Sequence, residues 1–332
     1  MLEHGGRLQQ AARRYGIALA DWLDLSTGIN PNGWPVPDLP AHTWSRLPDN
    51  DDGLEAAAHA YYGTQSLLPV AGSQAAIQAL PSLRGASRVG VLSPSYAEHA
   101  QAWQGHGHAT QAVSATQVNE VVARLDVLVL VHPNNPTGER FAIQQLIDWH
   151  AQLAVRGGWL IVDEAFMDAT PEASLAPFCP RAGLIVLRSL GKFFGLAGAR
   201  VGFVLAAREI LQALDEHLGP WTVSGPARAV ATLALQDRSW QSQTRARLTH
   251  DAQRLQELLR AVDLPPSGGS SLFQWVPTPQ AAVIHERLAR QGILSRLFSE
   301  PESLRFGLPA TELQWRRLRA SMAVQAELLY KP

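Results

Sequence analysis

The sequence predicts an α/β protein with a large domain built on a mostly parallel sheet and a smaller α/β C-terminal domain. Short runs of Val, Ile and Leu alternate with helical patterns through the middle of the chain. These runs are apolar throughout, which is typical of strands covered by helices on both faces of a sheet. From about residue 207 the pattern changes to long helices and a few short strands, which indicates the second domain.

Six apolar runs are expected to form the large sheet, at residues 67–70, 88–92, 126–131, 158–163, 184–189 and 200–206. Helical patterns precede or separate them at 53–62, 73–84, 95–105, 115–124 and 140–156. Beyond them we expect helices at 207–218, 226–264, 279–290 and 310–329, and strands near 271–276 and 303–307. Residues 1 to about 50 are rich in Pro, Gly and Trp and are expected to be irregular. We therefore divide the chain into 1–50, 51–206 and 207–332.

Composition excludes several classes of protein. Of the 332 residues, 46% are hydrophobic and 17% charged, which predicts a sizeable core and argues against disorder. The net charge is −1 without long runs of one sign, so we expect no binding to nucleic acid or to an acidic membrane. Cys179 is the only cysteine, which excludes an internal disulfide. No apolar leader or membrane-spanning run is present, and we expect a cytoplasmic protein.

Lysine is unusually rare in this chain, and one of the two lysines stands at a suggestive place. Lys331 lies near the C-terminus and is interpreted as a solvated charge, whereas Lys192 follows the apolar run at 184–189. Guanidinium stays charged at working pH, so only lysine can lose its proton and attack a carbonyl carbon. On its own, Lys192 is better explained as a surface or phosphate-binding lysine than as a nucleophile.

Polar residues that follow the strands decide between these readings, because ligands bind at the carboxyl ends of parallel strands. Each has a plain structural alternative: a helix cap, a packing aromatic ring, a Pro/Gly turn, or a carboxylate paired with an arginine. Together they offer an anion site, an aromatic ring, an amide, a buried carboxylate and a nucleophilic amine, which fits pyridoxal phosphate (PLP). They are Gly72, Ser73, Tyr96, Asn134, Asn135, Asp163, Ser189 and Lys192.

The segments "PNNPTG", "DEAF" and "SLGKFFGLAGARVGF" resemble, in order and approximate spacing, the signatures of fold-type I PLP enzymes of the class I/II aminotransferase superfamily. The resemblance covers nearly the whole chain. It implies that Lys192 forms an imine with PLP, Asp163 pairs with the ring nitrogen, and Asn135 binds the phenolic oxygen. It further implies that Tyr96 stacks on the ring, and that the cofactor phosphate is held by Gly72, Ser73, Gln74, Ser189 and Arg200.

Within this superfamily, histidinol-phosphate aminotransferases and the threonine-phosphate decarboxylases of cobalamin biosynthesis are the closest families. The opening "HGG" and the later "LDLSTGINPNGWP" resemble the decarboxylases. That resemblance implies a phosphorylated amino acid as substrate, a homodimer, and an N-terminal segment that contributes to the active site. The "HGG" segment has no obvious structural role. The implied substrate-binding residues are His4, Gly5, Asn30, Asn135, Arg296 and Arg305.

Two positions depart from the pattern of the relatives. Leu47 stands where many have a tyrosine that reaches the cofactor phosphate of the neighbouring subunit, and Phe166 replaces a tyrosine that bonds the phenolic oxygen. Transamination of histidinol phosphate is the main alternative activity. A dinucleotide site at "GLAGARVG" fails because that segment does not open a βαβ unit. Lys192 and Asp163 argue against a non-catalytic binding protein.

Overall fold

The computed structural model describes residues 4–329 and divides into two units, which are described in turn. The larger comprises residues 33–135 and 139–243 and is built on a seven-stranded sheet with the order β2-β8-β7-β6-β5-β3-β4. Its strands are β2 (Leu67–Val70), β3 (Arg88–Leu92), β4 (Ala109–Val113), β5 (Val127–Val131), β6 (Trp159–Asp163), β7 (Leu184–Ser189) and β8 (Gly202–Leu205).

The six expected strands all form, and the prediction of a mostly parallel sheet is confirmed. Strands β4, β3, β5, β6 and β7 pair in parallel, whereas β8 is antiparallel to both β7 and β2. The seventh strand, β4, was not expected, because it is an edge strand in which only Val113 is buried. An exposed edge needs no continuous apolar run, so the sequence carries little signal for it.

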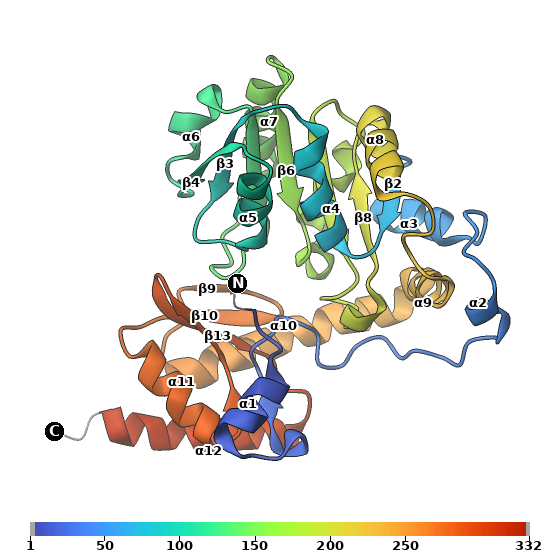
Figure 1. Cartoon of the computed structure of the whole chain (residues 1–332). Coiled ribbons are helices and arrows are strands. Elements are labelled where there is room, and N and C mark those ends of the chain that lie inside the picture. Colours follow the sequence, from blue (N-terminus) through green and yellow to red (C-terminus); the bar gives the residue numbers. More distant parts are fainter. Residues whose placement is uncertain (1–3, 330–332) are drawn as a thin grey trace. The chain divides into compact units, whose positions relative to one another are not determined.

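Helices cover both faces of this sheet (Figure 1). On one face, α4, α5 and α8 contribute Ile77, Trp103 and Leu214 to a core that includes the sheet residues Val129 and Ile185. The other face is covered by α7. The helices of the larger unit are α2 (His42–Ser45), α3 (Leu54–Tyr62), α4 (Ser73–Ala79), α5 (Glu98–Gly105), α6 (Val118–Val121), α7 (Ile143–Ala154), α8 (Arg208–Leu218) and α9 (Gly225–Gln236), with the start of α10 (Arg238–Arg260).

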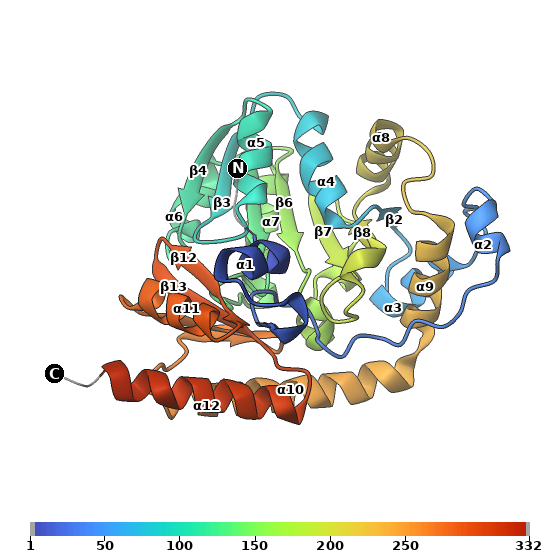
Figure 2. The same ribbon diagram turned by 60° about the horizontal axis from the view of Figure 1, so that its bottom comes forward.

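The smaller unit comprises residues 1–32, 136–138 and 244–332. It contains an antiparallel sheet in the order β12-β13-β10-β9 and a parallel pair β1-β11. Figure 2 shows α12 alongside the later part of α10, where Arg254 pairs with Glu312. The elements are α1 (Leu8–Tyr15), β1 (Leu23–Asp24), β9 (Gly268–Ser270), β10 (Phe273–Pro277), α11 (Ala281–Arg290), β11 (Ile293–Leu294), β12 (Arg296–Ser299), β13 (Glu302–Gly307) and α12 (Glu312–Leu329).

Two expectations about local structure were wrong. The N-terminal 50 residues are not wholly irregular, because α1 packs Ala11 against Ala289 and Leu294. The single helix expected at 226–264 is two helices, since the Asp237 carboxylate accepts the N–H of Trp240 at 3.0 Å and caps the start of α10.

The contacts also divide the chain differently from its sequence. Residues 33–50 and 207–243 pack with the larger unit, so the division at 50 and 206 stays a proposal about function. Lys331 lies outside the described residues. Within residues 4–329, none of the helices combines the length and apolarity needed to cross a bilayer.

Candidate active site

One edge of the large sheet collects the expected cofactor-binding residues of the larger unit. The parallel strands β3, β5, β6 and β7 lead at their carboxyl ends to Tyr96, Asn135, Asp163 and Ser189. Because β8 runs the other way, its first residue, Gly202, pairs with both Val70 and Ser189. The reversal therefore brings the residues that precede β8, including Arg200, to the edge where the other strands end.

Asp163 ends β6 with only 3% of its surface exposed, and a carboxylate buried in this way is costly unless it has partners. The sequence required a cation or an N–H group, and the structure supplies a histidine ring and a backbone N–H. His99 Nε2 lies 3.0 Å from Asp163 Oδ2, and the backbone N–H of Ala165 donates to Oδ1 at 3.0 Å. His99 is itself buried on α5, so it fixes the orientation of the carboxylate.

A chain of hydrogen bonds holds Tyr96 in place. Its hydroxyl donates to Gln74 Oε1 at 3.1 Å, and the Gln74 amide donates to Glu98 at 2.9 Å. The Tyr96 ring meets His99 edge-on, with ring centroids 6.1 Å apart. Burial raises the pKa of Tyr96 to about 12, with further contributions from Glu98 and Asp163, so the phenol stays neutral and can donate. The side chain of Gln74 thus serves Tyr96, which leaves its backbone N–H as the group available to an anion.

Gly72 and Arg200 form a cradle at the start of α4. Gly72 has φ +73, and a Cβ placed on it would lie 2.7 Å from Nη2 of Arg200, so only glycine leaves room for the guanidinium. Arg200 itself has φ 57, a left-handed conformation that is uncommon for arginine and often marks a functional constraint. Its Nη1 donates to the carbonyl of Ala197 at 3.0 Å. Guanidinium beside the N–H groups of a helix start is suited to a phosphate.

The two asparagines of "PNNPTG" have different surroundings. Asn134 is 1% exposed, accepts the Ser95 hydroxyl at 2.8 Å and donates to the Pro94 carbonyl at 2.8 Å. It therefore joins its loop to the loop that carries Tyr96. Asn135 is half-buried, so its side chain is more accessible than that of Asn134.

Lys192 lies in the turn between β7 and β8, half-buried, with Nζ 5.4 Å from the centroid of the Phe166 ring. Phe166 is buried and has no hydroxyl, so at this contact it offers the amine an aromatic face instead of a hydrogen bond. The next two residues, Phe193 and Phe194, are fully buried and pack on Trp240. The backbone beside the amine is therefore anchored.

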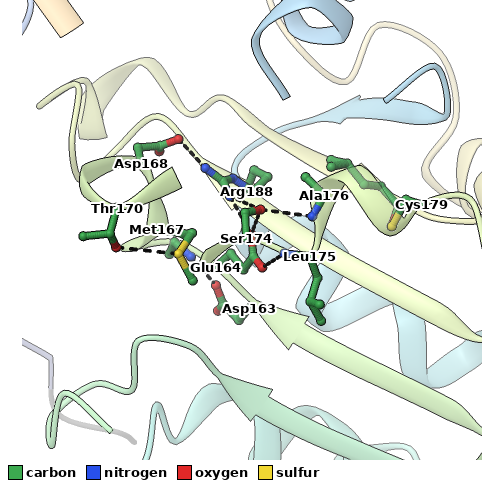
Figure 3. Close-up of polar contacts among 12 residues, drawn as sticks. Asp163, Glu164, Met167, Asp168, Thr170, Ser174, Leu175, Ala176, Cys179 and Arg188 are labelled. Atoms are coloured by element: carbon green, nitrogen blue, oxygen red, sulfur yellow. Dashed lines mark hydrogen bonds and ion pairs between the residues drawn. The ribbon is translucent and has the colours of Figure 1, made fainter. Parts of the chain in front are cut away.

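Reasoning from the sequence missed a buried ionic network next to this site (Figure 3). Arg188 donates to Glu164 at 2.5 Å and pairs with Asp168, and the Ser174 hydroxyl also donates to Glu164 at 2.5 Å. Burial disfavours the charge of Arg188, but the carboxylates of Asp168 and Glu164 outweigh this and raise its pKa. The only signal in the sequence was an arginine placed inside an apolar strand.

In the smaller unit, Arg296 and Arg305 stand opposite each other on the antiparallel strands β12 and β13. Arg305 is 6% exposed and donates to the Ser26 carbonyl at 2.7 Å. The pKa of Arg305 is lowered to about 10, first by burial and second by the positive charge of Arg296, while Asp24 opposes the change. Two guanidiniums held this close favour an anionic ligand.

The N-terminal "HGG" is tied to the same place, and the expectation that it has no structural role was wrong. A Cβ on Gly5 would lie 2.3 Å from the Ser26 carbonyl oxygen, and the N–H of Gly6 donates to the Ser26 hydroxyl at 2.8 Å. Ser26 thus contacts both glycines and also accepts the hydrogen bond from Arg305. His4 is half-buried at the start of this segment.

Asn30 is 2% exposed, and its amide oxygen has two partners. It accepts the N–H of Asn32 at 3.0 Å and Nη2 of Arg247 at 3.1 Å. The oxygen therefore shapes its own loop and links it to Arg247. Within the described part of the chain, no three His, Cys, Asp or Glu side chains gather in a way that could hold a metal ion.

Comparison with known proteins places this geometry in a family. Residues 21–324 match the model of the family described as aminotransferase class I and II. The chain belongs to this family. Among class I and II relatives, a threonine-phosphate decarboxylase of Pseudomonas aeruginosa is 60% identical over 322 residues, covering 97% of each chain. A threonine-phosphate decarboxylase of a Sinorhizobium species is 42% identical and covers 96% of this chain and 97% of its own.

Solved structures of other proteins share the fold. The histidinol-phosphate aminotransferase of Sinorhizobium meliloti, in complex with pyridoxal-5'-phosphate, aligns with a TM-score of 0.82 at 20% identity over 99% of this chain and 96% of its own. The L-threonine-O-3-phosphate decarboxylase of Porphyromonas gingivalis aligns with a TM-score of 0.74 at 17% identity, covering 91% and 99%. The fold-type I architecture inferred from the sequence is confirmed.

Proposed function

We propose that this protein decarboxylates L-threonine O-3-phosphate to (R)-1-amino-2-propanol O-2-phosphate with PLP, and so supplies the aminopropanol linker of cobalamin. The identity of 60% to a relative that bears the decarboxylase name, over 97% of both chains, carries the proposal. The paired arginines of the smaller unit support it, because they suit a substrate with both a phosphate and a carboxylate.

The residues of the larger unit fit the cofactor. The cradle at Gly72 and Arg200 matches a phosphate, and Lys192 supplies the amine for a covalent link. In this assignment Ser73, Gln74 and Ser189 complete the phosphate site, Tyr96 stacks on the ring and Asn135 binds the phenolic oxygen. PLP, when bound, accepts the electron pair left on the substrate Cα when a bond to that carbon breaks.

Asp163 and Lys192 are the catalytic residues in this assignment. Asp163, oriented by His99 and Ala165, holds a proton on the ring nitrogen, because a nearby carboxylate favours the protonated form. Lys192 gives a proton to Cα after carbon dioxide leaves. Both tasks need groups that are fixed in place, and the contacts described above fix them.

The choice of reaction depends on how the substrate is oriented. With the cofactor bound, the bond of the substrate Cα that breaks would be set by how the protein holds the substrate, so a decarboxylase would need residues that fix the orientation of the carboxylate. We assign this orientation to Arg296 and Arg305 together with His4, Gly5, Asn30 and Asn135. Bidentate guanidinium contacts suit both phosphate and carboxylate, and they restrict rotation more than a point charge does.

Transamination of histidinol phosphate is the second candidate, favoured by structural similarity to aminotransferases of that name. The two are separated by incubation with L-threonine phosphate while carbon dioxide and the amine are measured. Decarboxylation gives both products and leaves the cofactor as PLP. Transamination converts the cofactor to pyridoxamine phosphate, and that result with histidinol phosphate would overturn the proposal.

The cofactor assignment has its own test. The purified protein should absorb at roughly 400–430 nm, because PLP joined to a lysine as an imine absorbs in this range. Borohydride reduction should then fix the label on Lys192. A label on Lys331, or no label, would refute the assignment.

We further propose that the protein is a homodimer in the cytoplasm. Leu47 stands where many relatives have a tyrosine that reaches the cofactor phosphate of the neighbouring subunit, and it is 68% exposed in the chain. Close by in sequence, Trp44 is 71% exposed, and burial of such apolar surface favours association. Sedimentation analysis that gives a monomer would refute the proposed homodimer.

A further inference from the structure

Three charged side chains meet in the interior of the larger unit beside β6 and β7. Arg188 is 1% exposed, and Glu164 and Asp168 are fully buried. Figure 3 shows the guanidinium of Arg188 between Asp168 on one side and the Ser174–Glu164 pair on the other. The reaction proposed above uses none of these groups. Burial of three charges is seldom retained for stability alone, because apolar packing of similar volume often serves as well.

This network is adjacent in sequence to the residues assigned to the cofactor. Glu164 directly follows Asp163 at the end of β6, and Arg188 directly precedes Ser189 at the end of β7. Strands β6 and β7 are neighbours, with Asp163 opposite Leu187. Since successive side chains of a strand point to opposite faces, the side chain of Arg188 lies on the face of β7 opposite to that of Ser189. Its ion pairs therefore hold the end of β7 from that face.

The network continues to the far side of Lys192. The hydroxyl of Tyr61 donates to Asp168 at 3.2 Å, and the Tyr61 ring meets Phe194 edge-on with centroids 5.7 Å apart. Phe194 also stacks on Trp240. Arg188 before the lysine and Phe194 after it are thus joined by one connected set of contacts. We therefore expect a change at Arg188 to affect both ends of the segment that carries the amine.

We propose that Arg188 is a positioning residue that fixes Lys192 with respect to Asp163. The inference rests on the proposed function, because it concerns the geometry of the cofactor site. The planar fork of arginine contacts Glu164 and Asp168 at once through separate nitrogens, and a lysine ammonium cannot reproduce that geometry. Arg188→Lys should therefore keep the charge and loosen the arrangement.

The same unit provides a matched control. Arg228 on α9 is 4% exposed and also pairs with two carboxylates, Asp52 at 2.6 Å and Glu55 at 2.7 Å. These partners lie on or before α3 and are not among the residues assigned to the cofactor. Arg188→Lys and Arg228→Lys would each be compared with the wild-type holoenzyme by thermal unfolding. The pH titration of the cofactor absorbance, its visible circular dichroism, and kcat and KM would complete the comparison.

Both variants should melt at a lower temperature than the wild type, since each weakens a buried ionic network. Only Arg188→Lys should change the cofactor. We expect its visible circular dichroism to fall by about half or more and the absorbance titration midpoint to move. We expect kcat to fall about ten- to hundredfold, with KM for L-threonine phosphate changed less than about threefold. Arg228→Lys should keep the wild-type spectra, kcat and KM.

Wild-type spectra and kcat in Arg188→Lys, or equal changes in both variants, would overturn the inference and leave Arg188 a stabilising residue only. If Arg188→Lys does not fold, Tyr61→Phe decides, because it removes one hydroxyl and keeps the ring. Spectral changes in the same direction support the inference, and wild-type spectra overturn it. A wild-type protein that takes up no PLP on Lys192 would refute the proposed function and this inference with it. An unchanged Arg188→Lys beside a loaded wild type refutes the inference alone.

Discussion

The opposed pair Arg296 and Arg305 predicts a gain of stability when one charge is removed. The pKa of Arg305, lowered to about 10 by burial first and Arg296 second, corresponds to about 3 kcal/mol of disfavoured charge at about 1.4 kcal/mol per tenfold change in proton affinity. Because burial is the larger cause, we assign about 1 kcal/mol to Arg296. Arg296→Gln should therefore stabilise the free protein by about that amount.

Thermal unfolding without L-threonine phosphate measures the stability of the free protein, and unfolding with it measures the stabilisation by the ligand. An unfolding entropy of about 2 cal/mol/K per residue converts 1 kcal/mol into about 1–2 °C for a chain of this length. A ligand at a hundred times its Kd adds about 2.7 kcal/mol, or about 4 °C, to the wild type. Without ligand, Arg296→Gln should melt at a higher temperature than the wild type. With ligand, its melting temperature should rise much less than that of the wild type.

A control separates this effect from a general loss of surface charge. Arg316 is exposed on α12 of the same unit, so Arg316→Gln should leave both the melting temperature and the response to ligand close to those of the wild type. If Arg296→Gln melts lower than the wild type, or keeps the full ligand response, the two arginines do not form a strained anion site.

Three further outcomes are expected. Asp163→Asn should retain PLP, seen as visible absorbance, and lose most turnover, because a neutral amide does not favour the protonated ring nitrogen; near-normal kcat would point to another partner. His4→Ala, which leaves the glycines that pack on Ser26, should lower kcat/KM for threonine phosphate about ten- to hundredfold and spare cofactor binding; unchanged kinetics would make His4 a packing residue. Despite burial, Arg228 holds the pKa of Asp52 below its ordinary value. This stability is present above the ordinary pKa and lost as pH falls through the lowered one, so Arg228→Met should begin acid unfolding at a higher pH than the wild type, and coincident acid transitions would contradict this.

The sequence was most informative where a single physical demand acts on many residues. Strands buried on both faces need continuous apolar runs, so β5, β6 and β7 could be located within a residue or two. Edge strand β4 has no such demand, and it was missed. The direction of β8 was not predictable, because an apolar run carries no mark of its orientation.

Site residues followed the same rule. Asp163 had to have a partner because a buried carboxylate is costly, but nothing in the sequence pointed to His99, which comes from a helix far along the chain. The contacts of the Gln74 side chain with Tyr96 and Glu98 could not be predicted for a similar reason, because they depend on tertiary packing. Arg188 was read as part of a strand, and its partners came together only in the fold.

The reversed strand β8 has a consequence for the order in which the protein is assembled during synthesis. Strand β2 hydrogen-bonds to β8 and to no other strand of its sheet, and Leu67 pairs with Leu205. As the chain emerges from the ribosome, β3 to β7 have partners before β8 exists, whereas β2 must wait. The cradle between Gly72 and Arg200 closes with that last pairing. A nascent chain stopped before β8 therefore lacks the anion cradle. Binding of the cofactor can stabilise only chains whose translation has passed that strand.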